Sequence, residues 1–293
     1  MIGEFVSQVG GDNINLTVLM PPEANPHTYD PSPQDATTIA DADLVFFTGL
    51  KYEPAPLLKL LESSACSPEV LAEVGESVFP VEFKEGGHDD HDDHGEEGHD
   101  DEEGHDDEEE GHDGHEGHGH GAYDPHFWFD PNRVSYAAEY IEGKLIQYDP
   151  ANEESYKSLT DAFTTELRGL VNEVIELIGM IPSGNRKLIT THESLGYLEA
   201  KFGLEVLATI IPSLDSSDEV SPSDLVEVIE VIEEEGVKVM FVESETPSVY
   251  AETLAQETGI TLVTGLYVET LKPNQSYSEF LISNVELIVN NLK

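Results

Sequence analysis

The chain has 293 residues, of which 61 are acidic and 13 are basic, and its formal net charge at pH 7 is −48. This balance excludes partners of dense negative charge, such as nucleic acids and anionic lipid surfaces, and favours either cations as ligands or a high-salt habitat. A single cysteine, Cys66, excludes an intrachain disulfide and a cysteine-based zinc site, and we expect it to be a small buried side chain. No run of 18 apolar residues is present to span a membrane.

The first predicted element is an amphipathic helix. Residues 1–6 have the pattern of a helix interior, and the helix closes at Gly10 and Gly11. No basic stretch followed by an apolar run, the mark of a signal peptide, is visible. A chain that starts inside a helix indicates a truncated N-terminus, so we expect the natural sequence to extend upstream of Met1.

Two strands and a helix are predicted next. Residues 15–20 and 43–48 are apolar runs that end at Pro21 and Gly49, and they predict two strands. Between them, Ser32 is placed as an N-cap, and the proline after it pre-sets the first turn of a helix over residues 34–40. The order strand, helix, strand predicts that the two strands pair in parallel.

The segment over residues 85–120 contains only eighteen acidic residues, nine histidines and nine glycines. With no apolar side chain to bury, it is predicted to be a solvated, disordered insert in a larger domain, bounded at residues 85–121. Its dense imidazoles and carboxylates indicate weak, multivalent capture of metal ions, although the composition also fits an inert linker or a halophilic surface loop. The histidines of this accessory set are His88, His91, His94, His99, His105, His112, His115, His118 and His120.

Two helices are predicted after the insert. Asp130 and Pro131 repeat the cap pattern and predict a helix that runs to about residue 148. Residues 152–181 are the longest periodic segment and predict a helix of roughly 40 Å, long enough to cross a domain or to join two. Pro182 ends it. The apolar face of the first helix consists of Val134, Ala137, Ala138, Ile141 and Leu145.

The rest of the chain alternates strands with helices. Strands are predicted over residues 187–191, 204–210, 237–242 and 260–264, and helices over residues 194–202, 222–235, 249–258 and 277–290. Such regular alternation predicts a second parallel sheet covered by helices. The predicted fold class is therefore α/β, with two lobes that each contain a mainly parallel sheet flanked by helices.

Only three of the twelve histidines lie outside the insert. His27 follows the first predicted strand by a short proline-rich loop, His192 directly follows the strand over residues 187–191, and His126 lies four residues before the cap at Asp130. A single loop histidine is usually a surface residue or a hydrogen-bonding partner. Three of them at strand ends and helix starts, where parallel sheets bind ligands, indicate a joint metal site.

The residues around these histidines resemble a known family. Its successive signatures match residues 20–35, 124–132, 191–198 and 239–243, which read MPPEANPHTYDPSPQD, DPHFWFDPN, THESLGYL and VMFVE. From about Phe5 onward, the chain is similar to the zinc/manganese solute-binding proteins of ABC importers, the cluster A-I group. Four motifs in the same order make this resemblance specific, because any one of them alone is a weak signal.

The resemblance implies two α/β lobes joined by one long helix, with the ion held in the cleft between them. It divides the chain into an N-terminal lobe over residues 1–150, a bridging helix over residues 151–182 and a C-terminal lobe over residues 183–293. It also implies the metal ligands. They are His27, His126 and His192 together with Glu269, which stands where the family usually has an aspartate in a Tyr-x-Asp-Ser-Leu pattern.

Three imidazoles and one carboxylate suit Zn²⁺ better than Mn²⁺, which prefers more oxygen ligands and is the alternative ion. Asp124, Asp130 and Glu243 are candidates to orient the histidine rings. The resemblance further implies an extracytoplasmic protein that delivers the ion to the membrane permease of an ABC importer, with a signal peptide upstream of this chain. We expect a monomer.

Two alternatives belong to other classes of protein. A zinc hydrolase also uses three histidines, but it needs an open coordination position and a general base, and no His-Glu-x-x-His element occurs here. We therefore expect no enzymatic activity. An intracellular zinc buffer or storage protein fits the lack of a visible export signal. The reading frame upstream of Met1 separates the two remaining functions, because a signal sequence there favours the importer.

Overall fold

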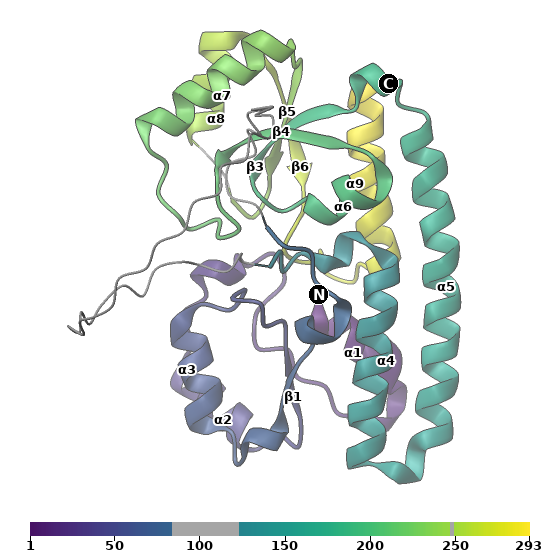
Figure 1. The fold of residues 1–293 in the computed structure, drawn as a ribbon. Coiled ribbons are helices and arrows are strands. Elements are labelled where there is room, and N and C mark those ends of the chain that lie inside the picture. Colours follow the sequence, from purple (N-terminus) through teal and green to yellow (C-terminus); the bar gives the residue numbers. More distant parts are fainter. Residues whose placement is uncertain (84–122, 247–248) are drawn as a thin grey trace, which may run out of the picture.

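The structure is a computed structural model that describes residues 1–83, 123–246 and 249–293. The described residues form a two-stranded and a four-stranded sheet. Figure 1 shows two regions of different build around these sheets, with the long helix α5 (Glu153–Gly179) running along one side of the molecule past both. The insert predicted over residues 85–120 and the accessory metal capture by its histidines lie outside the described residues.

The N-terminal sheet pairs β1 (Val45–Phe47) with β2 (Leu71–Glu73) in parallel. The strand predicted over residues 43–48 is present in shortened form, but the strand predicted over residues 15–20 is wrong, because these residues form no strand. Val18 lies against Gly3 at the start of the chain, so this apolar run meets a helix instead of a neighbouring strand. An apolar run does not encode which segment lies beside it.

The helices of the N-terminal region begin and end where local chemistry predicts. α1 (Ile2–Gly10) ends at Gly11, whose φ of 53° disfavours any residue with a Cβ. α2 (Pro33–Ala40) has a capping box, in which the side chains of Ser32 and Asp35 each accept the other's backbone N–H. α3 (Ala55–Ser64) is not among the predicted elements, although its buried Leu57 and Leu61 are one helical turn apart. Cys66, just beyond it, is exposed and not buried as expected.

The C-terminal region contains the parallel sheet that the alternating pattern predicts. Its strand order is β4-β3-β5-β6, and every neighbouring pair is parallel. The strands are β3 (Lys187–His192), β4 (Glu205–Ile211), β5 (Val239–Glu243) and β6 (Thr261–Leu266). The helices are α6 (Gly196–Phe202), α7 (Pro222–Glu235), α8 (Val249–Thr258) and α9 (Tyr277–Leu292). With parallel sheets and flanking helices in both regions, the α/β class is confirmed.

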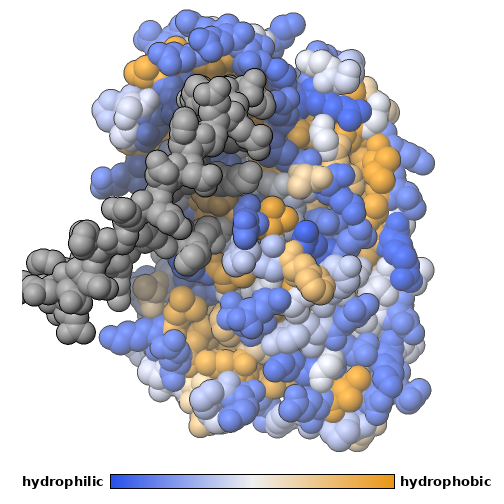
Figure 2. All heavy atoms as spheres, viewed as in Figure 1, coloured by the Kyte–Doolittle hydropathy of each residue, from blue (hydrophilic) through white to orange (hydrophobic). Residues whose placement is uncertain are grey.

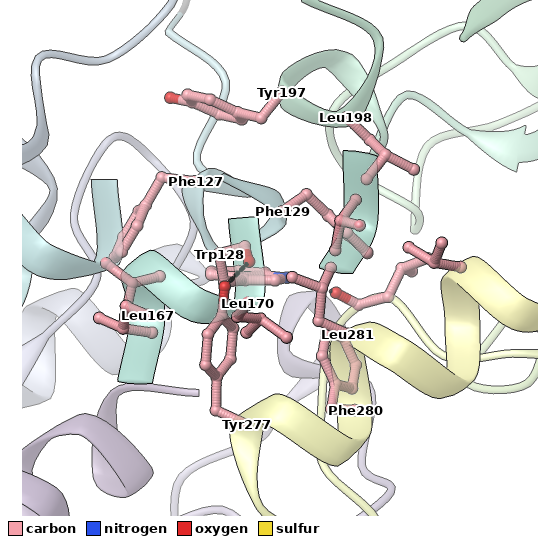
Figure 3. Close-up of a cluster of buried hydrophobic side chains, with 14 of the residues drawn as sticks. Phe127, Trp128, Phe129, Leu167, Leu170, Tyr197, Leu198, Tyr277, Phe280 and Leu281 are labelled. Atoms are coloured by element: carbon pink, nitrogen blue, oxygen red, sulfur yellow. Dashed lines mark hydrogen bonds between the residues drawn. The ribbon is translucent and has the colours of Figure 1, made fainter. Parts of the chain in front are cut away.

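The core is continuous between the two regions. The predicted apolar face of α4 (Pro131–Tyr148) is buried, and Figure 3 shows Phe127, Trp128 and Phe129 packed among side chains that include Tyr277 and Phe280. Burial of one large aromatic ring contributes roughly 4–6 kcal/mol by area. One hydrophobic cluster contains residues that precede α5 in the chain and residues that follow it. The division into separate lobes at residues 150 and 182 therefore stays a prediction.

The visible surface is mostly polar. Figure 2 shows a face on which hydrophilic residues predominate, interrupted by scattered hydrophobic groups, as the acidic composition leads one to expect. Among the helices in the described part of the chain, none combines the length and the apolarity that crossing a membrane requires.

Candidate metal centre

Four buried side chains from the two regions converge on one point. His27 lies in a 3-10 turn (Pro26–Thr28), His126 precedes a second such turn (Phe127–Phe129), His192 ends β3, and Glu269 follows β6. Each offers one ligand atom, and these atoms all lie within 4.8 Å of one another. His27 is 6% exposed and the other three are wholly buried. The fold therefore brings together all four residues that the sequence predicts as ligands.

The carboxylate of Glu269 is at the centre of this cluster. Its Oε1 lies 3.2 Å from Nε2 of His27, 3.4 Å from Nε2 of His126 and 3.0 Å from Nε2 of His192. With bonds of 2.0–2.1 Å, neighbouring ligand atoms of a tetrahedral zinc site are about 3.3 Å apart, so these distances fit its edges. Nε2 of His192 is buried and makes no hydrogen bond of acceptable geometry within the described residues, which suits a ligand atom.

The two N-terminal histidines share a local motif, Asx-Pro-His. Oδ1 of Asn25 accepts the backbone N–H of His27 at 2.9 Å, and Oδ1 of Asp124 accepts that of His126 at 2.8 Å. These are Asx-turns, in which a side chain fixes the irregular backbone two residues further on. Oδ1 of Asp124 also lies 2.8 Å from Nδ1 of His126. The turn thus orients this ring and leaves its Nε2 directed at Glu269.

His192 is oriented by the neighbouring strand. Because β3 and β5 are adjacent, Glu243 at the end of β5 lies beside the end of β3. Its Oε1 accepts the backbone N–H of His192 at 3.2 Å, and its Oε2 lies 2.6 Å from Nδ1 of the same ring. The hydroxyl of Ser194 donates to Oε1 as well. Glu243 and Asp124, two of the three predicted ring partners, therefore hold their histidines in the same way.

His27 is held less firmly than the other two rings. Its Nδ1 lies 3.7 Å from Oδ1 of Asp215, a residue that the sequence did not indicate and whose side chain is about half exposed. The prediction that Asp130 orients a histidine ring is wrong. Its carboxylate caps α4 by accepting the backbone N–H of Asn132 at 3.0 Å. Its other oxygen, Oδ2, lies 3.7 Å from Nε of Arg133, so both oxygens of Asp130 contact the helix that this residue caps.

Two further residues hold Glu269, and the sequence pattern did not single them out. The hydroxyl of Tyr52 donates to Oε2 of Glu269 at 2.9 Å. Oε1 of Glu245 accepts the backbone N–H groups of Glu269 and Thr270, each at 3.2 Å. One signal could have found them. Tyr52 follows β1 and Glu245 follows β5, and the carboxyl ends of parallel strands are where such sheets bind ligands.

The charges in the site shift one another's pKa values. Burial lowers the pKa of His126, but the charge of Glu269 and the hydrogen bond with Asp124 outweigh it and raise this pKa to about 9. Burial also lowers the pKa of His192, yet Glu243 and Glu269 together hold it well above its usual range. The pKa of Glu269, which burial raises, is held well below its usual range by the surrounding histidines. A divalent cation that binds here therefore replaces protons on imidazoles.

Known proteins share this sequence pattern over nearly the whole chain. The family described as ZnuA, zinc-uptake complex component A, periplasmic, matches residues 1–291. The chain is 27% identical to the high-affinity zinc uptake system protein ZnuA of Bacillus subtilis, over 99% of this chain and 84% of that protein. It is 24% identical to the manganese ABC transporter substrate-binding lipoprotein PsaA of Streptococcus anginosus, over 100% of this chain and 86% of that protein.

The fold also has a counterpart among solved structures. The periplasmic zinc binding protein TroA from Treponema pallidum aligns with a TM-score of 0.81 at 20% identity, over 100% of this chain and 96% of that chain. The relatives are metal-binding, substrate-binding components of uptake systems and not enzymes. Because the family match extends from residue 1 to residue 291, this protein belongs to the family of the periplasmic zinc-uptake complex component A.

Proposed function

We propose that this protein is the extracytoplasmic zinc-binding component of an ABC importer. It holds one ion through His27, His126, His192 and Glu269 and delivers it to a membrane permease. The names of its relatives include both zinc and manganese, so the family alone does not decide the ion. The donor set supports zinc, because three imidazole nitrogens and one carboxylate oxygen make a nitrogen-rich set, whereas manganese prefers more oxygen ligands.

The convergence of three Nε2 atoms on one carboxylate oxygen carries this proposal. The distances of 3.0–3.4 Å from Oε1 of Glu269 to the three nitrogens match the edges of a tetrahedral zinc site, and all four ligand atoms lie within 4.8 Å of one another. The rings of His126 and His192 are already fixed by carboxylates at their Nδ1 atoms. A site that is ordered before the ion arrives spends little of the binding free energy on ordering its ligands, which supports high affinity.

The origin of the ligands supports a role in delivery as well as in binding. His27 and His126 precede the long helix α5 in the chain, and His192 and Glu269 follow it. Movement of one region away from the other would separate two ligands from the remaining two and so lower the affinity. We propose that docking on the permease favours such an open form, as expected of a two-state element whose equilibrium a partner shifts.

Metal content and competition titration test the choice of ion. We expect protein purified without added metal to hold one zinc ion per chain, measured by elemental mass spectrometry. Titration against a chelator of known affinity is expected to show zinc bound far more tightly than manganese. Equal or tighter binding of manganese would overturn the zinc assignment, and the absence of any tight site would overturn the proposed function.

Cell fractionation tests the proposed location. The protein expressed from its full reading frame is expected outside the cytoplasmic membrane, and its loss is expected to slow growth only when zinc is scarce. Recovery of the full-length protein in the cytosol would favour the alternative function of an intracellular zinc buffer.

A further inference from the structure

The two oxygens of the Glu269 carboxylate have different surroundings. Oε1 faces Nε2 of His27, His126 and His192. Oε2 accepts the hydroxyl of Tyr52 at 2.9 Å. Glu269 is wholly buried and Tyr52 is 5% exposed. Oε1 therefore lies among the three proposed ligand nitrogens, whereas Oε2 is hydrogen-bonded to a phenol.

The hydroxyl of Tyr52 is held in place by its own surroundings. Its ring packs edge-on against the rings of His27 and Trp128, with centroids 5.1 and 5.3 Å apart. Its backbone N–H donates to the carbonyl of Gly49 at 3.0 Å, which closes a tight turn. The carboxylate of Glu53 stabilises this turn by accepting two backbone N–H groups after β1, one of them from Gly49 at 2.9 Å. The position of the hydroxyl is thus set by packing and by the backbone.

Glu269 is also restrained from its backbone side. Glu245 accepts the N–H groups of Glu269 and Thr270, and Trp128 donates its indole N–H to the carbonyl of Val268 at 2.7 Å. With the backbone held at both neighbours, the carboxylate can bring Oε2 to the ion only by rotating about its side-chain bonds. A rotation that carries Oε2 out of reach of Tyr52 leaves a buried hydroxyl without its acceptor, which is unfavourable.

We propose that Tyr52 makes the site selective for zinc over manganese by keeping Oε2 of Glu269 away from the ion, so that the carboxylate binds through Oε1 alone. This inference rests on the proposed function and concerns the same site. A single carboxylate oxygen completes a four-ligand set with three imidazoles, which zinc prefers. Manganese, which favours more oxygen ligands, is denied the second oxygen.

The protonation state of Tyr52 agrees with this role. Burial and the charge of Glu269 hold the pKa of Tyr52 well above its usual value, so the phenol remains a donor. Because Glu269 is ionised, the hydrogen bond is of the charge-assisted kind and stronger than a neutral one. Loss of such a bond corresponds to about a ten- to hundredfold change in an equilibrium constant.

Tyr52→Phe tests the inference, because it removes the hydroxyl and keeps the ring. Zinc and manganese dissociation constants are measured by competition titration for the wild type and the variant. We expect the ratio of zinc affinity to manganese affinity to fall about ten- to hundredfold. Tyr156→Phe is the matched control. Tyr156 is also buried and donates to a carboxylate, that of Asp149 at 2.9 Å, but it lies on α5 and contacts no proposed ligand through this bond. The ratio of zinc affinity to manganese affinity in Tyr156→Phe is therefore expected to stay at the wild-type value.

X-ray absorption spectra of the zinc-loaded wild type provide a second measurement that does not depend on the folding of a variant. We expect four ligand atoms at 2.0–2.2 Å from the zinc ion, one of them a carboxylate oxygen. A second carboxylate oxygen at that distance would overturn the inference, as would an unchanged affinity ratio in Tyr52→Phe when the wild type binds zinc tightly. Failure of the wild type to bind zinc tightly would overturn the proposed function itself.

Discussion

The two regions of the molecule position the proposed ligands in different ways. In the C-terminal region, His192 is the last residue of a buried strand, and its ring partner ends the adjacent strand. In the N-terminal region, each strand of the sheet has three residues, and both ligands lie on irregular turns. There the backbone of each histidine is held by the Asx-Pro-His motif and not by a strand, since Asn25 and Asp124 each accept the N–H of a histidine. Strand hydrogen bonds in one region and Asx-turns in the other thus both fix the position of a histidine.

The comparison also ranks the three rings. His192 and His126 each have a carboxylate within 2.8 Å of Nδ1, one in each region. His27 has only Asp215, at 3.7 Å and half exposed. The N-terminal region therefore contributes one firmly held ligand and one loosely held ligand. We expect the C-terminal half of the site to be the more rigid half. Five measurements, from the largest expected effect to the smallest, test how the two regions hold their histidines.

Loss of one ligand from either region is expected to have the largest effect. If four ligands share the roughly 10–16 kcal/mol typical of a structural zinc site, His192→Ala and His27→Ala each weaken zinc binding about a hundred- to thousandfold. Competition titration measures the loss, and circular dichroism checks that the variants fold. Retention of tight zinc by His192→Ala would remove the C-terminal strand from the site.

Changing the pH is expected to alter zinc affinity by a similar amount. The pKa of His126 is raised to about 9, so this ring carries a proton in the metal-free protein at neutral pH, and zinc must displace it. From pH 7 to pH 9, the affinity is expected to rise about tenfold per unit for each proton released and to level off above pH 9. Titrations at several pH values, corrected for the protonation of the chelator, measure this slope. A flat profile would contradict the proton displacement.

The stability of the metal-free protein is expected to follow the opposite trend. The folded pKa of His126, about 9, exceeds its unfolded value of 6.5. The stabilisation from this group is therefore fully present below pH 6.5 and is lost as pH rises through about 9. Denaturant unfolding of metal-free protein between pH 6.5 and pH 9 measures this loss. His126→Gln is the control, since its unfolding free energy lacks this contribution.

Removal of one ring partner is expected to have an intermediate effect in both regions. Glu243→Gln and Asp124→Asn keep the size of the side chain but remove the charge that orients the ring. Loss of a residue that hydrogen-bonds a metal-binding histidine typically lowers metal affinity about ten- to hundredfold. We expect the larger loss for Glu243→Gln, because Glu243 also bonds Ser194 and a backbone N–H. A larger loss for Asp124→Asn, measured by the same titration, would reverse the ranking of the two regions.

The smallest effect is expected at the exposed partner of His27. Asp215→Asn removes a half-exposed charge at 3.7 Å, and such pairs are worth less than about 1 kcal/mol, or about fivefold in affinity. Raising the salt concentration is expected to abolish even this difference. A loss as large as that of Asp124→Asn would show that His27 depends on Asp215 as His126 depends on Asp124.

Interactions between residues near one another in the chain determined much of the secondary structure of this protein. The caps at Ser32 and Asp130 set helix starts, and the alternating pattern after residue 183 predicted every strand of the C-terminal sheet to within two residues. Because nine of the twelve histidines lie in the insert, subtraction isolated the other three as candidate ligands. These inferences succeed because each depends on residues that are near one another in the chain.

Tertiary structure decided what depends on distant neighbours. The apolar run over residues 15–20 looked like a strand, yet β1 pairs with β2 instead, because pairing requires a segment alongside and not only a pattern. The sequence indicated Asp130 both as a helix cap and as a candidate ring partner, and the carboxylate caps the helix by accepting the backbone N–H of Asn132. Tyr52 and Glu269 are 217 positions apart, and only the fold makes the phenol the partner of one carboxylate oxygen. Residue types along the chain indicated the donor set, whereas the packing of distant segments determined which oxygen of Glu269 faces the three histidine nitrogens.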